Sequence, residues 1–98
     1  MNQPPEVIGG ARLFRWSVID DRHRPTGNCR QIVAGVLQGP AAGLAICQDE
    51  GEAAYYLFGC DSEWNSVTDT WHETLEAALE QAEFEYSGVS GTWIVVPE

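Results

Sequence analysis

Residues 54–86 constrain the fold of this chain more than any other stretch, because they carry two strong local patterns in direct succession. The first pattern is YYLFGC and SVTDTWH, two runs of strand-forming residues joined by the five-residue polar connection DSEWN, an ordinary hairpin length. The second pattern, TLEAALEQAEFEY, repeats apolar residues at helical spacing. We therefore expect a β-hairpin that leads directly into a helix.

The hairpin has an expected register. The loop length pairs Cys60 with Ser66, and two positions further from the loop Phe58 would then lie opposite Thr68. Both faces would carry apolar side chains, which is unusual for a half-solvated hairpin. Either the hairpin is covered on both faces, or one face meets a partner. The two expected faces are Tyr56, Phe58 and Cys60 on one side, and Tyr55, Leu57, Val67 and Trp71 on the other.

The helix is expected to begin at Thr74, a good N-cap, with Glu76 in the first turn where the helix dipole favours negative charge. A capping box of Thr70 and Glu73 is the alternative, and it would start the helix one turn earlier. Ser87–Gly88 should end the helix. The buried stripe consists of Leu75, Ala78, Leu79, Ala82 and Tyr86.

The rest of the chain favours short strands separated by turns. Residues 11–20 alternate, with Leu13 on one face and Phe14, Trp16 and Val18 on the other. Residues 29–38 suit a helix by spacing but favour a bent strand by composition, and strand is the prediction. Residues 44–48 and 92–96 read as further strands, and residues 1–10 as a frayed arm.

The fold class that follows is α+β in a single domain of 98 residues. We expect an antiparallel sheet of about five or six strands, with one long helix from the C-terminal half packed on one face and a final strand after it. A chain of this length buries roughly two-thirds of its unfolded surface, enough for one modest core.

The charge distribution is one-sided. The chain has a net charge of −10 and no lysine, and residues 31–98 contain no lysine or arginine at all. This argues against nucleic-acid binding, which depends on cationic side chains, and it would attract a basic partner. Solubility alone is the simpler explanation. No apolar run is long enough for a membrane span and no export signal is visible, so a cytoplasmic location is the expectation.

The cysteines favour a structural role. Cys29, Cys47 and Cys60 are widely spaced and form no CxxC motif, so we expect small buried residues rather than a zinc or redox site. A nucleophilic pair of Cys60 and His72 would be separated by about 20 Å of strand. No metal and no other cofactor is predicted, because no sequence motif for phosphate, dinucleotide or metal binding is present.

One polar cluster could support a site. Asp69, His72 and Glu73 could form a small acid–base or metal group. Two carboxylates and one imidazole are a sparse ligand set, and a polar strand end leading into a helix cap is the favoured explanation.

The aromatic residues supply the interaction candidates. Trp71 and Trp93 are expected in or beside the core. Trp64 lies in the hairpin loop, where it either folds back over the sheet or presents itself to a partner, and Phe84 lies off the buried stripe of the helix. The full set of candidates is Trp64, Phe84, Asp61, Glu63 and Glu80.

The segment YYLFGCDSEWNSVTDTWHETLEAALEQAEFEY resembles a group of small uncharacterised bacterial proteins with a YLFxCD strand, then WNxxTDTWH, then a TLExAxxQAEFEY helix. The resemblance covers the last half of the chain. It implies only a small bacterial, cytoplasmic α+β domain, and no catalytic residue can be carried over from it.

The leading functional hypothesis is a non-enzymatic module that binds a protein partner through acidic and aromatic surface. Neutralisation of a toxin, as by immunity proteins, is one specific form of it, by analogy of size and charge only. The alternative is a small ligand-binding protein or enzyme with a site near Asp69, His72 and Glu73. Self-association as a homodimer is a third hypothesis.

Overall fold

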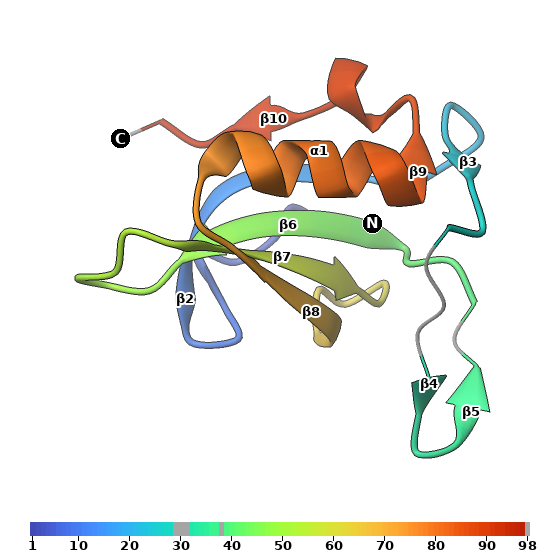
Figure 1. Ribbon diagram of the computed structural model, residues 1–98, viewed down its shortest axis with the longest axis horizontal. Coiled ribbons are helices and arrows are strands. Elements are labelled where there is room, and N and C mark those ends of the chain that lie inside the picture. Colours follow the sequence, from blue (N-terminus) through green and yellow to red (C-terminus); the bar gives the residue numbers. More distant parts are fainter. Residues whose placement is uncertain (29–31, 38, 98) are drawn as a thin grey trace.

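The computed structural model describes residues 1–28, 32–37 and 39–97 and has an α+β fold with one long helix on a curled antiparallel sheet (Figure 1). The main sheet has the order β1-β2-β6-β7-β8, and β10 also pairs with β2. These strands are β1 (Val7–Ile8), β2 (Ala11–Val18), β6 (Gly43–Gln48), β7 (Tyr55–Cys60), β8 (Ser66–His72) and β10 (Ile94–Val95). The expected fold class is confirmed.

The central strands β6 and β7 are covered on both faces. Leu44, Ile46 and Leu57 point toward the helix, where they form one apolar cluster. The alternate residues, among them Ala45 and Phe58, point to the opposite face and form a second cluster. Such two-sided burial explains why β6 reads as a continuous apolar run rather than an alternating one.

The helix α1 (Leu75–Glu85) begins where the Thr74 prediction places it. Thr74 lies in extended backbone, and its Oγ1 accepts a hydrogen bond of 3.0 Å from the Ala77 N–H, so the alternative start at Thr70 is not used. Ala78 and Ala82 are buried against the sheet. The helix ends at Glu85, and the left-handed Gly88 (φ 98°) follows three residues later. Tyr86 therefore lies just outside the helix, although it still packs on the helix-side cluster.

A second, smaller hairpin replaces the single strand expected within residues 29–38. It consists of β4 (Ile32–Val33) and β5 (Val36–Leu37), joined by Ala34 and Gly35, which both have positive φ. Two consecutive left-handed residues make the tight turn that matches strand twist. The prediction was wrong because a two-residue turn inside an apolar run leaves no polar interruption to mark it. This hairpin projects from the body of the molecule (Figure 1). Cys29 lies outside the described residues.

The first ten residues, expected to form a frayed arm, pack against the sheet. Val7 and Ile8 pair with β2, and Ile8 is buried. The Asn2 carbonyl accepts a 2.6 Å hydrogen bond from the Trp64 indole N–H. The N-terminal segment thus covers part of the sheet face opposite the helix.

Two β-bulges change the expected side-chain directions. In β8, Cys60 pairs with Ser66 as expected, but Gly59 pairs with Thr68, so Val67 is an extra residue. Phe58 consequently lies opposite Asp69, not Thr68. Trp71 moves to the opposite face from that expected and is 55% exposed, so its predicted place in or beside the core is wrong.

The second bulge lies in β2, where Leu13 pairs with Cys47 and Arg15 with Ile46, which leaves Phe14 as the extra residue. Leu13 and Trp16 consequently belong to the same cluster, against the simple alternation expected for residues 11–20. Phe14 packs instead edge-on against Tyr55, with ring centroids 5.5 Å apart.

The C-terminal part closes the fold. Residues Tyr86–Ser87 form β9, which pairs with β3 (Arg24–Pro25), and the 3-10 turn η1 (Val89–Gly91) follows. Val89 is fully buried and belongs to the helix-side cluster together with Ala78 and Ala82. The final strand, β10, then pairs with β2, as a shorter element than the expected 92–96.

Replacement of Gly43 by alanine should destabilise the fold. A Cβ at this position would come within 2.6 Å of the Trp64 ring, so the ring must move away from the sheet. We expect Gly43→Ala to lower the free energy of unfolding by about 1–3 kcal/mol, as for other overpacked sites, and to change tryptophan fluorescence. Chemical denaturation measures both effects. Gly39→Ala is the control, because a Cβ there meets no atom within 4 Å. Equal stability of the two variants would contradict the close contact.

Candidate functional site

Trp64 folds back over the sheet. Its side chain is 4% exposed, its ring lies edge-on to Trp16 at 5.7 Å, and its backbone has a positive φ of 65°. Of the two alternatives for this residue, the structure therefore shows the packed one, and Trp64 offers no exposed anchor to a partner. The loop geometry decides this outcome, because the left-handed backbone turns the indole inward.

Asp61 organises that loop. Its Oδ1 accepts hydrogen bonds from the Glu63 and Asn65 N–H groups at 2.9 and 3.0 Å, and its Oδ2 accepts one from the Asn65 side chain. The Asn65 side chain, followed by these backbone donors, lowers the pKa of Asp61. Asp61 is thus a structural residue of the loop, whereas Glu63 is exposed.

Phe84 and Glu80 lie on the outer face of α1, as their spacing predicts. Phe84 is 50% exposed, and Glu80 is exposed one turn earlier. The Phe84 carbonyl accepts hydrogen bonds from Thr26 Oγ1 (2.6 Å) and Asn28 Nδ2 (3.0 Å). The segment that leads toward the β4–β5 hairpin is therefore fixed to the helix beside Phe84.

The polar group of Asp69, His72 and Glu73 is not brought together. Asp69 lies opposite Phe58 and His72 opposite Tyr55, so the two side chains leave opposite faces of the sheet. His72 Nε2 is 2.7 Å from Thr70 Oγ1, and burial lowers the pKa of the imidazole. The proposed acid–base or metal geometry has no support here, and the described residues contain no cluster of three or more metal-ligating side chains.

Two of the cysteines are buried and free, as expected. Burial, with a smaller contribution from Asp61, raises the pKa of Cys60 to about 12, and burial also raises the pKa of Cys47 to about 12. Such thiols are protonated at neutral pH and poor nucleophiles. Cys60 lies at the loop end of its hairpin and His72 at the other end, so the excluded pair is also separated in the structure.

The sequence did not point to His23, which is buried in a chain of hydrogen bonds. The Asp20 N–H donates to His23 Nδ1 at 3.1 Å, so Nε2 carries the proton and donates to Thr92 Oγ1 at 2.7 Å. Thr92 Oγ1 lies 2.8 Å from Ser17 Oγ. A catalytic triad needs the opposite arrangement, with Nε2 free to accept the hydroxyl proton. This series of hydrogen bonds therefore joins β2, the loop that follows it and the C-terminal segment. Only the structure could reveal it, because Ser17 and Thr92 are 75 positions apart.

Glu83 joins the end of α1 to η1. Its carboxylate accepts hydrogen bonds from the Gly88 N–H (2.8 Å), the Ser90 N–H (3.0 Å) and Ser90 Oγ (2.7 Å). These donors, Ser90 Oγ first, lower the pKa of Glu83. The glutamate thereby stabilises the turn that buries Val89.

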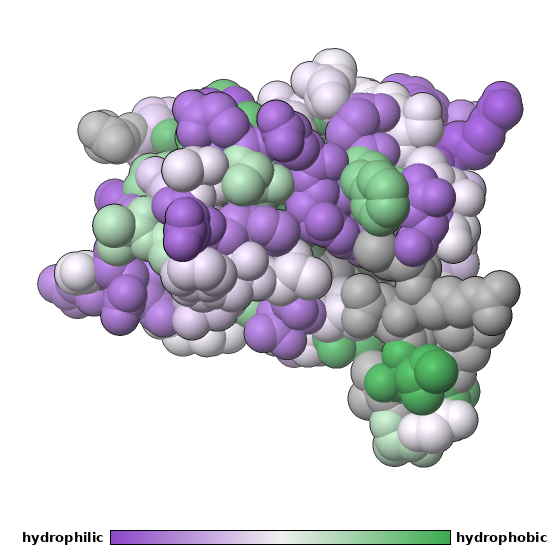
Figure 2. All heavy atoms as spheres, in the orientation of Figure 1, coloured by the Kyte–Doolittle hydropathy of each residue, from purple (hydrophilic) through white to green (hydrophobic). Residues whose placement is uncertain are grey.

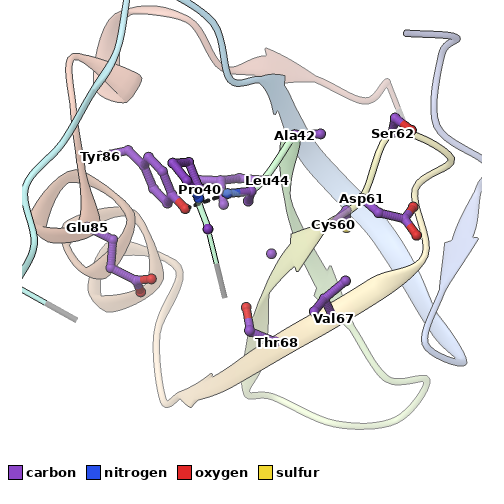
Figure 3. A pocket seen from close by; sticks show the side chains of 13 residues that line it. Pro40, Ala42, Leu44, Cys60, Asp61, Ser62, Val67, Thr68, Glu85 and Tyr86 are labelled. Atoms are coloured by element: carbon purple, nitrogen blue, oxygen red, sulfur yellow. Dashed lines mark hydrogen bonds between the residues drawn. The ribbon is translucent and has the colours of Figure 1, made fainter. Parts of the chain in front are cut away.

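A cavity of about 340 Å³ lies beside the C-terminal end of α1, between β7, β8 and the segment of residues 39–42 (Figure 3). Pro40, Leu44 and Val67 contribute apolar walls, while Tyr86, Thr68 and Glu85 contribute polar atoms. The volume falls at the lower end of the range typical of small-molecule sites. No local pattern in the sequence indicates this cavity, since its residues come from four separate segments.

The projecting hairpin carries the most exposed large apolar side chains of the described residues. Ile32 is 66% and Val36 62% exposed. In Figure 2, hydrophobic green is concentrated on this hairpin, whereas the helix-bearing face above it is mostly purple and white. Within the part of the chain that the structure describes, no helix is long and apolar enough to cross a membrane.

Comparison with known proteins gives no relative: no protein-family model, no curated protein and no solved structure matches the chain. The resemblance of residues 55–86 to a bacterial protein group stays a prediction.

The thiols of Cys47 and Cys60 should be unreactive in the folded protein. In a Cys29→Ser background, which leaves these two, Ellman's reagent at about pH 8 should modify neither thiol until denaturant is added, because both are buried and protonated. The unfolded chain is the positive control and should release two equivalents. Fast modification of native protein would show that a thiol is accessible and activated.

Glu83 should make stability depend on pH. Because its folded-state pKa lies below the ordinary value of 4.5, its contribution is present above that pH and is lost as the pH falls through the folded-state pKa. We expect the midpoint temperature of thermal unfolding to fall when the pH is lowered from about 5 to about 3. This decrease should be smaller for Glu83→Gln than for the wild type. Glu80→Gln removes the same charge without these hydrogen bonds and should retain the wild-type change.

Proposed function

We propose that this protein is a non-enzymatic interaction module that binds a protein partner. The observation that carries the proposal is the projecting β4–β5 hairpin, which holds Ile32 and Val36 in solvent. Large apolar side chains gathered on a protruding element are typical of interaction surfaces, because their exposure costs free energy that binding recovers. Ile32, Val36 and Phe84 are called the contact surface below.

Phe84 extends the contact surface onto α1. Thr26 and Asn28 fix the chain next to Phe84, only a few residues before Ile32, so the aromatic ring and the hairpin belong to the same end of the molecule. An exposed phenylalanine is suited to an apolar pocket on the partner. The partner should therefore present both an apolar groove and a site that receives an aromatic ring.

The charge of the chain indicates the remaining chemistry of the partner. The net charge is −10, and α1 exposes Glu80 one turn before Phe84 and Glu76 one turn before Glu80. Acidic side chains around an apolar contact favour a basic partner, and they increase the rate of association more than the final affinity. A cationic toxin neutralised by this protein is one specific form of the proposal, supported by size and charge alone.

The alternative of a ligand site or enzyme at Asp69, His72 and Glu73 receives no support from their positions, since the first two point to opposite faces. Self-association through the contact surface would compete with partner binding. Sedimentation equilibrium of the wild type and the hairpin variant below separates self-association from binding to another protein.

The contact surface can be tested by affinity capture from a lysate of the source organism. We expect the double variant Ile32→Ser/Val36→Ser, and separately Phe84→Ser, to weaken the binding of a captured partner at least about tenfold, as for interface hot spots. High salt should slow association because exposed charges are screened.

Ile94→Ser is the matched control, because Ile94 is a similarly exposed apolar residue (48%) on β10. It should bind as the wild type does. Capture that all three variants retain equally would contradict the proposed surface, as would the absence of any partner at both low and high salt.

A further inference from the structure

The cavity lies where the C-terminal end of α1 and Tyr86 face the loop end of β7 and β8. Alternate residues of β7 and β8 face the helix, and Leu57 lies under Ala78 and Ala82 in the helix-side cluster. Nearer the hairpin loop, Gly59 and Thr68 form a pair on the same face and line the cavity together with Glu85. Segment 39–42 and Tyr86 enclose this part of the sheet from the side.

Gly59 keeps the floor of the cavity low. A Cβ at this position would collide with Thr68 Oγ1 and would lie 3.6 Å from the Ala41 Cβ. Its φ is not in the left-handed region, so the backbone itself does not demand glycine here. The absence of a side chain is needed for space, which is the role expected where another group approaches a strand closely.

Tyr86 forms a fixed wall with a polar tip. Its hydroxyl oxygen accepts a 2.8 Å hydrogen bond from the Ala41 N–H, which holds segment 39–42 against the aromatic ring. Burial, with a smaller effect of Glu85, raises the pKa of Tyr86, so the hydroxyl stays protonated and can donate to a ligand. The wall is thus formed before any ligand arrives.

The charge at the cavity is negative. Glu85 directs its carboxylate toward the space between α1 and β8, whereas the Asp61 carboxylate points away from it (Figure 3). Glu85 Oε2 accepts one hydrogen bond of 2.9 Å, from Gln81 Nε2. No arginine or lysine is among the described residues that line the cavity. Among these described residues, the repulsion that an anionic ligand would meet is compensated by no lysine or arginine.

We infer that this cavity is a binding site for a small organic cation with an apolar body, such as a protonated arylalkylamine. The ammonium group would pair with Glu85, while Pro40, Leu44 and Val67 would contact the apolar body. The site is distinct from the contact surface of Ile32, Val36 and Phe84, and the inference does not depend on the proposed protein partner.

Three probes with the same phenylethyl body and different charge test the inference on the wild-type chain. At about pH 7, 2-phenylethylamine is cationic, 2-phenylethanol neutral and 3-phenylpropionate anionic. Titration followed by amide NMR should shift the signals of Gly59, Thr68 and Tyr86 with the amine, with a Kd on the order of 1 mM. The alcohol should bind about two- to fivefold more weakly, and the carboxylate should leave these signals unchanged.

Two charge-neutral variants locate the cationic subsite. Glu85→Gln should weaken binding of the amine about two- to fivefold and leave binding of the alcohol unchanged. Glu80→Gln removes the same charge from the exposed face of the same helix and should bind the amine as the wild type does. Both variants should retain the wild-type pattern of amide signals elsewhere.

Several results would overturn the inference. In the titrations of the wild-type protein, binding of the carboxylate as tight as that of the amine would contradict the inference. It would also be contradicted if the three amide signals did not shift up to about 20 mM amine, far above the expected Kd. Equal binding of the amine by Glu85→Gln and Glu80→Gln would show that Glu85 does not recognise the cation. Failure of partner capture leaves each of these results unaffected, because no partner takes part.

Discussion

The burial of the first five residues of strand β6 is the constraint on which the rest of the fold depends. Residues 43–47 are buried on both faces, so each face of the sheet needs its own cover. One cover is α1, which places alanines against Leu44 and Ile46 and brings the backbone of the helix close to the sheet. The other is assembled from the N-terminal segment and Trp64, joined by the hydrogen bond from the indole to Asn2.

Local patterns predicted the elements of this fold well where neighbouring residues decide the structure. The N-cap at Thr74, the stripe on α1 and the pairing of Cys60 with Ser66 are confirmed, because each depends on residues close in sequence. The faces of β2 and β8 were partly mispredicted. One bulge at Phe14 and another at Val67 shift the alternation by one residue, and period-two counting has no means of detecting an extra residue.

The candidate sites were less predictable than the fold. Trp64 has polar neighbours in the sequence but is buried, with a left-handed backbone, a hydrogen bond to the Asn2 carbonyl and edge-on packing against Trp16. The cavity is lined by residues from four separate segments and depends on the hydrogen bond between Tyr86 and Ala41, a contact across 45 residues. Phe84 could be assigned to the surface because helical periodicity alone determines its direction. Features that depend on contacts between residues far apart in the sequence were therefore not predicted.

The bulge at Val67 also affects how two copies of the chain can meet. In the part of the chain that the structure describes, β8 pairs with β7 only, so its outer edge presents unpaired backbone groups that could template further strands. The extra residue interrupts the regular spacing of those groups, and Asp69 places a charge in the same strand. A bulge and a charge are two of the features by which natural edge strands resist pairing with a further strand, and β8 has both.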